Sequence, residues 1–333
     1  MTLFTTQQRV RRDPYTRRLE RLGIEVELSA PSFDAFAHAR GGLYDLVLLS
    51  TPGAASGSID VARRAFPDAT ILYDSVDLHF LRQERRAEIV GGVSERDYWI
   101  EKELECIRRS DITVTVTENE AQIVRSLVPS ARTFVLPVVY EPDPEPRLPY
   151  DATSDLLFIG GFLHDPNIDA VRYLAREILP LITDEVDARL WVIGPHPPEE
   201  IRALASASVV IAGHVPDVAS HLRRARVFVS PVRFGAGMKG KNAHAMAYGV
   251  PLVTTTVGAE GMDLIDGDHV LIRDGAESFA AGVLALYRDP VLWGRLATQS
   301  WEVARARWSP DAMLSKLDAL LTAAASARGD QRP

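Results

Sequence analysis

Short apolar runs rich in β-branched residues alternate with longer helical stretches along the whole chain, and this alternation limits the folds open to it. In the first half, strands are expected at residues 24–28, 45–50, 70–74, 112–117 and 133–138. In the second half, they are expected at residues 156–159, 189–193, 209–212, 227–230, 252–255 and 270–272. Strands that alternate with helices form parallel sheets with helices packed against them. The predicted fold class is therefore α/β.

A proline-rich segment divides the chain. Residues 140–149 contain four prolines in ten positions, and such a segment is stiff, extended and free of regular structure. A length of 333 residues is about right for two domains. We predict an N-terminal Rossmann-like domain over 1–140, a linker over 141–150 and a C-terminal Rossmann-like domain over 151–308, facing each other across a cleft. Residues 309–333 are expected to form a closing helix and a frayed tail.

Charge and composition exclude several classes of protein. The net charge of −8 argues against nonspecific binding to nucleic acid. No apolar run approaches the ~20 residues of a membrane-spanning helix, and the first residues lack the apolar core of a signal peptide. The single cysteine, Cys106, excludes an intramolecular disulfide and fits a reducing compartment. We therefore expect a cytoplasmic protein.

The segment 230–262 carries the strongest chemical signal in the chain. An apolar strand leads into a glycine-rich loop with Lys239 and Lys241, and a short helix follows. Such a loop aims backbone N–H groups and the positive end of a helix at an anion. Gly235 and Gly237 would let the backbone approach that anion closely. We predict a site for a phosphate-bearing ligand; the alternative is a pair of solubilising lysines among flexible turn glycines.

Several segments of the second half occur in an order that resembles the donor domain of a known group of enzymes. They are residues 156–170, 190–195, 213–217, 225–231 and 230–262. Together they resemble retaining glycosyltransferases of the "glycosyl transferases group 1" (family 4-like) type, which have the GT-B architecture of two Rossmann-like domains. The resemblance is strong over residues 154–308. The first half matches more loosely, at residues 44–50, 73–79 and 110–120.

This resemblance implies transfer of a sugar, with retention, from a UDP- or GDP-linked donor to an unidentified acceptor, without a metal or another cofactor. Lys241 is the first candidate for a diphosphate contact and for catalysis, and Lys239 is the second. In such enzymes, lysines and a helix N-terminus stabilise the leaving diphosphate. The turn at Gly160 and Gly161 would face the cleft, and Glu260 would reach donor hydroxyls. A structural turn and an exposed loop acid are the alternatives.

Two positions depart from the family pattern. Relatives often carry two glutamates separated by seven residues, and Ala236 and His244 occupy these places here. A neutral imidazole exchanges one hydrogen bond with a ribose hydroxyl, whereas a carboxylate accepts two. His244 is kept as a donor-binding candidate. A second hypothesis therefore stands beside the transferase: a catalytically impaired relative that acts as a binding or partner subunit.

Two other enzyme classes rank lower. A nucleotide-sugar epimerase of the same architecture would have the paired glutamates that are missing here. A nicotinamide-dependent dehydrogenase would need a Gly-x-Gly-x-x-Gly motif after an early strand, and the first 140 residues contain none.

Polar residues gather just after the strand expected at residues 70–74. Asp74, Asp77 and His79 would lie at the carboxyl edge that faces the cleft. Asp77 and His79 are the candidates for binding the acceptor or orienting the transferred sugar. The alternative is that Asp77 caps the next helix. No further His or Cys cluster completes a metal site, so no metal ligand is predicted.

The N-terminal domain looks short. Only residues 2–6 precede the first expected helix, and no glycine occurs before Gly23. We therefore expect its opening strand to be rudimentary, missing or supplied by a partner chain, which would cover the open edge. For Arg11, Arg12, Arg17 and Arg18, we favour a solvated helix face, and peripheral docking on a membrane is the alternative.

Overall fold

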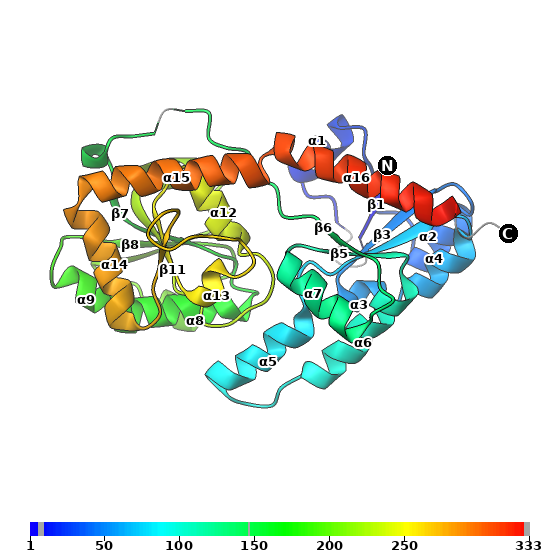
Figure 1. The fold of residues 1–333 in the computed structure, drawn as a ribbon, viewed down its shortest axis with the longest axis horizontal. Helices are drawn as coiled ribbons and strands as arrows, with labels where there is room; N and C mark the ends of the chain where they lie inside the picture. Colours follow the sequence, from blue (N-terminus) through cyan, green and yellow to red (C-terminus); the bar gives the residue numbers. More distant parts are fainter. Residues whose placement is uncertain (6–9, 146, 330–333) are drawn as a thin grey trace.

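The computed structural model describes residues 1–5, 10–145 and 147–329, which form two lobes that each contain a parallel sheet (Figure 1). The strands of the first lobe are β1 (Thr2–Phe4), β2 (Glu25–Glu27), β3 (Leu46–Ser50), β4 (Thr70–Asp74), β5 (Ile112–Thr115) and β6 (Thr133–Val135). Those of the second lobe are β7 (Ser154–Ile159), β8 (Leu190–Ile193), β9 (Val209–Gly213), β10 (Ala225–Ser230), β11 (Leu252–Thr254) and β12 (Leu271–Ile272). The predicted α/β fold is confirmed, and each strand from β2 onward overlaps an expected one.

Helices connect the strands in both lobes. Those of the first lobe are α1 (Tyr15–Arg21), α2 (Phe33–Ala39), α3 (Pro52–Ala55), α4 (Ile59–Ala65), α5 (His79–Val90), α6 (Arg96–Arg109) and α7 (Glu118–Leu127). After the short turn η1 (Tyr150–Ala152), the second lobe contains α8 (Asp165–Tyr173), the π-helical turn η2 (Leu174–Ile178), α9 (Leu179–Thr183), α10 (Glu199–Arg202), α11 (Ala219–Arg224), α12 (Gly240–Ala247), α13 (Thr256–Ala259), α14 (Ala276–Arg288) and α15 (Pro290–Trp308). The last helix is α16 (Pro310–Gly329).

The sheet of the second lobe is buried on both faces. Its strand order is β12-β11-β10-β7-β8-β9. Leu156 and Leu157 of β7 belong to two different apolar clusters, and Val227 and Phe228 of β10 divide in the same way. Strands of a parallel sheet covered on both faces are continuous apolar runs, which is why these strands are visible in the sequence. Because β7 and β10 are paired in parallel, their carboxyl ends stand at one edge.

The first lobe opens with a two-stranded sheet that lies beside the main one. β1 pairs in parallel with β2, and Thr2 Oγ1 donates a hydrogen bond of 2.9 Å to Glu25 Oε2. The Tyr44 hydroxyl, just before β3, donates to Thr2 Oγ1 over 2.7 Å. Of the three expectations for the opening strand, the structure shows the rudimentary one, with three residues. Contact with a partner chain or a membrane stays a prediction.

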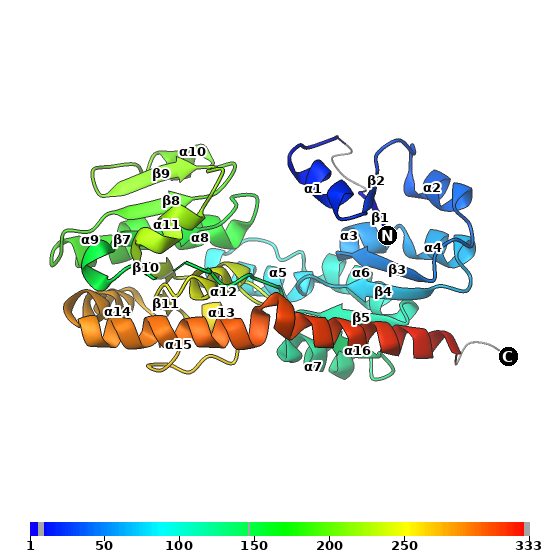
Figure 2. The ribbon, with the colours of Figure 1, turned by 90° about the horizontal axis from the view of Figure 1, so that it is seen from above.

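The last helix crosses from the second lobe to the first. Figure 2 shows α16 continuing from the end of α15 and lying along the sheet β3-β4-β5-β6. Leu320 and Ala324 of α16 pack with Leu72 of β4, and the Thr70 hydroxyl donates a hydrogen bond of 2.7 Å to the carbonyl oxygen of Ala324. The helix continues to Gly329. The frayed tail expected after residue 326 is therefore helical as far as the structure describes it, since residues 330–333 lie outside the described part.

The proline-rich segment is attached to the second lobe. Its described residues contain no helix or strand before η1. Asp143 receives two hydrogen bonds of 2.7 Å from the guanidinium of Arg223. The backbone N–H of Tyr140 donates to the carbonyl oxygen of Trp308 over 2.8 Å. The segment thus runs along the lobe that it introduces.

Candidate functional site

The glycine-rich loop leaves the carboxyl end of β10 and leads into α12. Gly235 (φ 150°) and Gly237 (φ 65°) have positive φ values that residues with side chains rarely adopt. A Cβ at Gly237 would lie 3.1 Å from Asp77 Cβ and 3.2 Å from a methyl carbon of Val116, both in the first lobe. This glycine therefore lets the loop approach the first lobe closely. The predicted approach of Gly235 and Gly237 to a phosphate stays a prediction.

Lys241 lies in the first turn of α12, at the carboxyl edge of the second sheet. Its Nζ donates a hydrogen bond to Asn167 Oδ1 and lies 4.5 Å from the centre of the Phe158 ring, within the range of a cation–π contact. Burial, followed by the charge of Lys239, lowers the pKa of Lys241 to about 7. The side chain of the N-cap residue, Lys239, makes no capping bond, and the backbone N–H groups of Gly240 and Asn242 donate to backbone carbonyl oxygens. The ammonium and the positive end of the helix thus lie together, as an anion site requires.

Lys239 is buried and turned into its own loop. Its Nζ donates to the carbonyl oxygens of Gly237 and Ala236, over 2.7 and 3.3 Å. Burial lowers the pKa of Lys239 to about 8, against the opposing effects of Glu260 and Glu120. A contact between this lysine and a diphosphate would require its bonds to the loop to break. Lys239 therefore remains the second candidate, behind Lys241.

The turn at Gly160 and Gly161 follows β7 and is tied to Lys241 by a residue that sequence reasoning missed. The Asn167 amide donates a hydrogen bond of 2.7 Å to the carbonyl oxygen of Gly161 and accepts one from Lys241. A Cβ at Gly160 would lie 2.7 Å from Asn167 Cγ, so a glycine is needed there. The signal available in the sequence was an asparagine in the first turn of a helix that follows this glycine pair.

His244 lies between two tyrosines. Its ring stacks on Tyr140 of the proline-rich segment, with centroids 4.9 Å apart and planes 18° from parallel. Tyr248 meets it edge-on at 5.5 Å. Burial lowers the pKa of His244, so the imidazole is neutral at pH 7. A contact between His244 and a ribose hydroxyl stays a prediction, and the stacked ring shows what replaces the family carboxylate in this chain.

Glu260 is already paired with the first lobe. Its carboxylate receives two hydrogen bonds from the Arg85 guanidinium, over 2.6 and 2.8 Å. Arg85 also donates to the carbonyl oxygen of Gly235 over 2.8 Å. Glu260 is therefore not the exposed loop acid of the alternative interpretation. Sequence reasoning missed Arg85 because nothing local marks an arginine in α5 as the partner of a residue 175 positions away.

Asp77 and His79 lie together just before and at the start of α5. His79 Nδ1 is 3.0 Å from Asp77 Oδ1, and Arg82 donates a hydrogen bond to the other carboxylate oxygen. Burial acts against ionisation, but the bond to His79 and the charge of Arg82 hold the pKa of Asp77 below its usual value. The His79 ring lies 5.0 Å from that of Trp99. The alternative role of Asp77 as a cap is not observed, since no side chain of the N-cap residue caps α5.

Two other carboxylates occupy the start of α5. Glu103 of α6 accepts hydrogen bonds from the backbone N–H groups of His79 and Phe80, over 2.9 and 3.0 Å. Glu120 of α7 accepts one from the N–H of Leu78 over 3.0 Å. Burial raises the pKa of Glu103 and that of Glu120 to about 7 each. These acids were missed because they are 23 to 42 positions away from the N–H groups that they bind.

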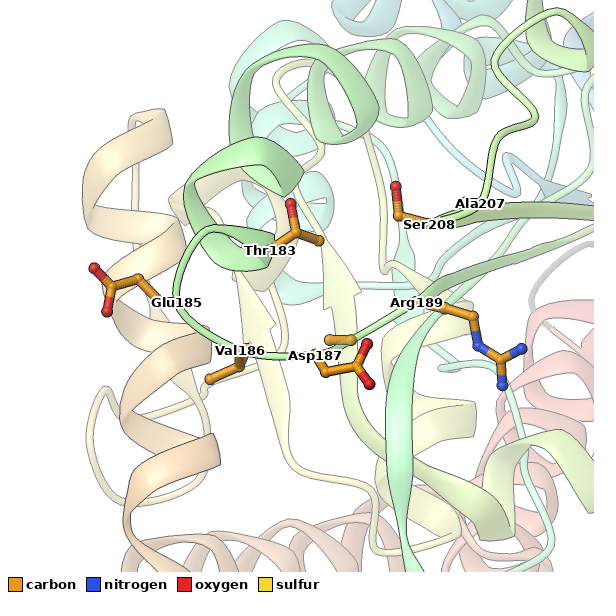
Figure 3. A pocket seen from close by; sticks show the side chains of 8 residues that line it. Thr183, Glu185, Val186, Asp187, Arg189, Ala207 and Ser208 are labelled. Atoms are coloured by element: carbon orange, nitrogen blue, oxygen red, sulfur yellow. The ribbon is translucent and has the colours of Figure 1, made fainter.

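A surface cavity lies far from these residues, at the opposite end of the second sheet (Figure 3). Its volume is about 510 Å³. Thr183, Glu185, Val186, Asp187, Ala188, Arg189, Ala207 and Ser208 line it. Arg189 and Ser208 immediately precede β8 and β9, so the cavity faces the amino ends of the strands. Ligands of open α/β sheets bind beyond the carboxyl ends, and this cavity is therefore not the candidate site.

In residues 1–5, 10–145 and 147–329, no group of three His, Cys, Asp or Glu side chains is arranged to hold a metal ion. No helix in these ranges is long and apolar enough to cross a membrane.

Comparison with known proteins supports the sequence resemblance. Residues 153–289 match the family described as "Glycosyl transferases group 1". This match begins just before β7 and ends after α14, so it contains the glycine-rich loop, Asn167 and Lys241. The matched segment lies within the second lobe. No curated protein sequence matches the chain.

Solved structures show the fold of the whole chain. Sucrose-phosphate synthase from Thermosynechococcus elongatus has a TM-score of 0.72 and 17% identity, over 96% of this chain and 81% of that one. HepE from Anabaena, in complex with UDP and glucose, has a TM-score of 0.75 and 12% identity, over 96% and 91%. The pneumococcal O-GlcNAc transferase GtfA, in complex with UDP and GlcNAc, has a TM-score of 0.67 and 13% identity, over 87% and 59%. The predicted GT-B architecture is confirmed.

Proposed function

We propose that the protein is a glycosyltransferase that takes a sugar from a nucleoside-diphosphate sugar, with the diphosphate bound beside Lys241 at the start of α12. One observation carries this proposal: in a lobe that matches the group 1 glycosyltransferases, Lys241 stands beside a helix N-terminus that no side chain caps. HepE and GtfA, which share the fold, were solved with UDP. We extend the same class of donor, UDP- or GDP-linked, to this chain.

The proposed chemistry follows from charge. As the bond from the sugar to the diphosphate breaks, negative charge grows on the leaving group. The Lys241 ammonium and the positive end of the α12 dipole would stabilise it without a metal ion. On the facing edge, Asp77 holds one ring nitrogen of His79, and His79 is the proposed group for orienting the acceptor or taking its proton. Retention of configuration and a cytoplasmic setting complete the proposal, the latter supported by the buried, unpaired Cys106.

The test is a titration of the protein with UDP, GDP and their hexose conjugates, followed by thermal unfolding. A ligand at 100 times its dissociation constant adds about 2.7 kcal/mol to the free energy of unfolding. Lys241→Ala is expected to weaken nucleotide binding roughly 10- to 100-fold, since a hydrogen bond to a charged group contributes about 1.5–3 kcal/mol. Lys316→Ala, on the exposed surface of α16, is the matched control. The absence of a shift with every nucleotide would contradict the proposal.

A second candidate function is a binding or partner subunit with impaired catalysis. His244, stacked on Tyr140, stands in place of a family glutamate, and Glu260 is engaged by Arg85. Both observations favour this alternative. Product analysis by mass spectrometry separates the two: a protein that binds UDP or GDP but neither transfers nor hydrolyses the sugar of any bound conjugate supports the binding subunit.

A further inference from the structure

Asn167 uses both ends of its side-chain amide. The residue is 5% exposed and lies in the first turn of α8. Its Nδ2 donates to the carbonyl oxygen of Gly161 over 2.7 Å, and its Oδ1 accepts from Lys241 Nζ. A carbonyl oxygen and an ammonium require opposite ends of the amide. The orientation of Asn167 is therefore determined by its two partners.

The surroundings of Lys241 leave its charge uncompensated. Phe158 offers the face of its ring, and Asn167 offers a neutral oxygen. The charge of Lys239 lowers the pKa of Lys241, and the charge of Lys241 in turn lowers the pKa of His164, which lies just before α8. A carboxylate in the place of Asn167 would form an ion pair with the ammonium and reduce its attraction for an anion. The Asn167 amide accepts a hydrogen bond from the same ammonium without neutralising its charge.

We propose that Asn167 is a positioning residue of the donor site, which holds the Lys241 ammonium at the carboxyl edge of β7 and β10 so that its remaining N–H groups face the diphosphate. Asn167 acts through Lys241 and does not touch the reacting atoms. A flexible lysine side chain loses rotamer freedom when it binds, and a lysine held in advance loses less. This inference rests on the proposed function for its ligand, whereas the contact between Asn167 and Lys241 is tested without any ligand.

The competing interpretation is that Asn167 only supports the turn at Gly161. Two variants separate these roles, because both lose the bond to Gly161 and differ at Lys241. In Asn167→Asp, a carboxylate touches the ammonium and favours its charged form, so the Lys241 pKa rises. In Asn167→Ala, the acceptor is gone and the Lys241 pKa falls. A purely structural role would give no shifts of opposite sign.

The first experiment measures Lys241 in the full-length protein without nucleotide. The extent of acetylation of Lys241 as a function of pH, read by peptide mass spectrometry, gives its titration midpoint. We expect Asn167→Asp to raise the midpoint by about one pH unit or more and Asn167→Ala to lower it. Asn119→Asp, on the exposed surface of α7, is the control and should leave the midpoint unchanged. Unchanged midpoints in both Asn167 variants would overturn the inference. Asn167→Asp alone decides the question if the alanine variant does not fold.

The second experiment titrates the same proteins with UDP and GDP by calorimetry. We expect Asn167→Ala to weaken binding roughly tenfold and Asn167→Asp to weaken it further, because a paired ammonium attracts a diphosphate less. Equal affinities in the wild type and both variants would overturn the positioning role. If the wild type binds neither nucleotide, the donor role of Asn167 falls together with the proposed function. The acetylation midpoints still decide whether Asn167 controls Lys241.

Discussion

The carboxyl edges of the two sheets meet in this protein. They differ in the groups that surround the N-terminus of the following helix, which is α5 in the first lobe and α12 in the second. In the first lobe, the first N–H groups of α5 are taken by Glu103 and Glu120. In the second lobe, the N–H groups of Gly240 and Asn242 at the start of α12 donate to backbone carbonyls, and Lys241 lies in the first turn. A helix N-terminus attracts an anion in either case. The first lobe supplies that anion itself, and in the second lobe we propose that a ligand supplies it.

The difference teaches where a charged substrate belongs. The acidic edge contains Asp77 in addition to the two glutamates, and Arg82 on the same edge pairs with Asp77. The opposite edge contains Lys239 and Lys241. Across the interface, Lys239 interacts electrostatically with Glu120 and Asp77. We therefore expect a diphosphate on the second lobe, beside its lysines.

The largest effect on stability is expected when α5 loses its capping residue Glu103. Glu103→Ala leaves the buried N–H groups of His79 and Phe80 without their acceptors, and each unsatisfied donor costs ~1–3 kcal/mol. We expect a loss of about 2–4 kcal/mol in the free energy of unfolding, measured with urea. Glu101→Ala, on the exposed side of the same helix, is the control. A loss equal to that of the control would mean that α5 does not depend on this acid.

The next largest effect is expected on nucleotide affinity, when the edge with Lys239 and Lys241 loses the charge of Lys241. Lys241→Met keeps the length of the side chain and removes its charge. Nucleotide affinity is expected to fall roughly 10- to 100-fold, while the melting temperature of the free protein at pH 7 rises, because a buried ammonium no longer opposes folding. Calorimetric titration and scanning calorimetry measure the two changes. A variant that binds UDP or GDP as well as the wild type, or that melts at a lower temperature, would contradict this assignment.

The dependence of stability on pH sharpens the comparison. The pKa of Glu103 and that of Glu120 rise from 4.5 to about 7 on folding, so their stabilising contribution is present below pH 4.5 and is lost as pH rises through 7. The pKa of Lys241 falls from 10.5 to about 7, so its penalty is relieved as pH rises from 7 to 10.5. We expect Glu120→Gln to flatten the first change and Lys241→Met the second, each on the order of 1 kcal/mol. Urea unfolding from pH 5 to 9 tests this, and unchanged slopes would refute it.

The smallest effect concerns the contact between the edges. Arg85→Ala removes the ion pair with Glu260 and the bond to Gly235, and a partly exposed pair contributes ~0.5–1 kcal/mol. We expect a larger radius of gyration by small-angle X-ray scattering, since the lobes separate more readily. Arg86→Ala is the matched control, because Arg86 pairs with Asp165, whose side chain is 56% exposed. If the control opens the protein as much as Arg85→Ala does, Glu260 has no special part in holding the lobes together.

Local patterns were sufficient for most of the fold. Buried parallel strands such as β7 and β10 are continuous apolar runs. The helices between the strands begin and end at residues that commonly mark helix ends. Both patterns can be recognised within a short stretch of sequence. The loop with Lys241 could be recognised because its glycines and lysines lie within a few residues of each other. Contacts between distant residues leave no local pattern. The cap of α5 by Glu103 and the hydrogen bond from Lys241 to Asn167 cannot be predicted from the spacing of residues in the sequence. Each depends on how two helices pack.

The return of α16 to the first lobe has a mechanical consequence. The chain passes between the lobes twice, through the proline-rich segment and at Ser309, and the bond from Tyr140 to Trp308 holds these two passages side by side. Two adjacent crossings define a single hinge line, about which the two lobes would rotate. Figure 1 shows this line at the side of α15 and α16, with α5 on the other side. A rotation about this line would move the rim with Arg85 and Glu260 farther than the residues beside the line.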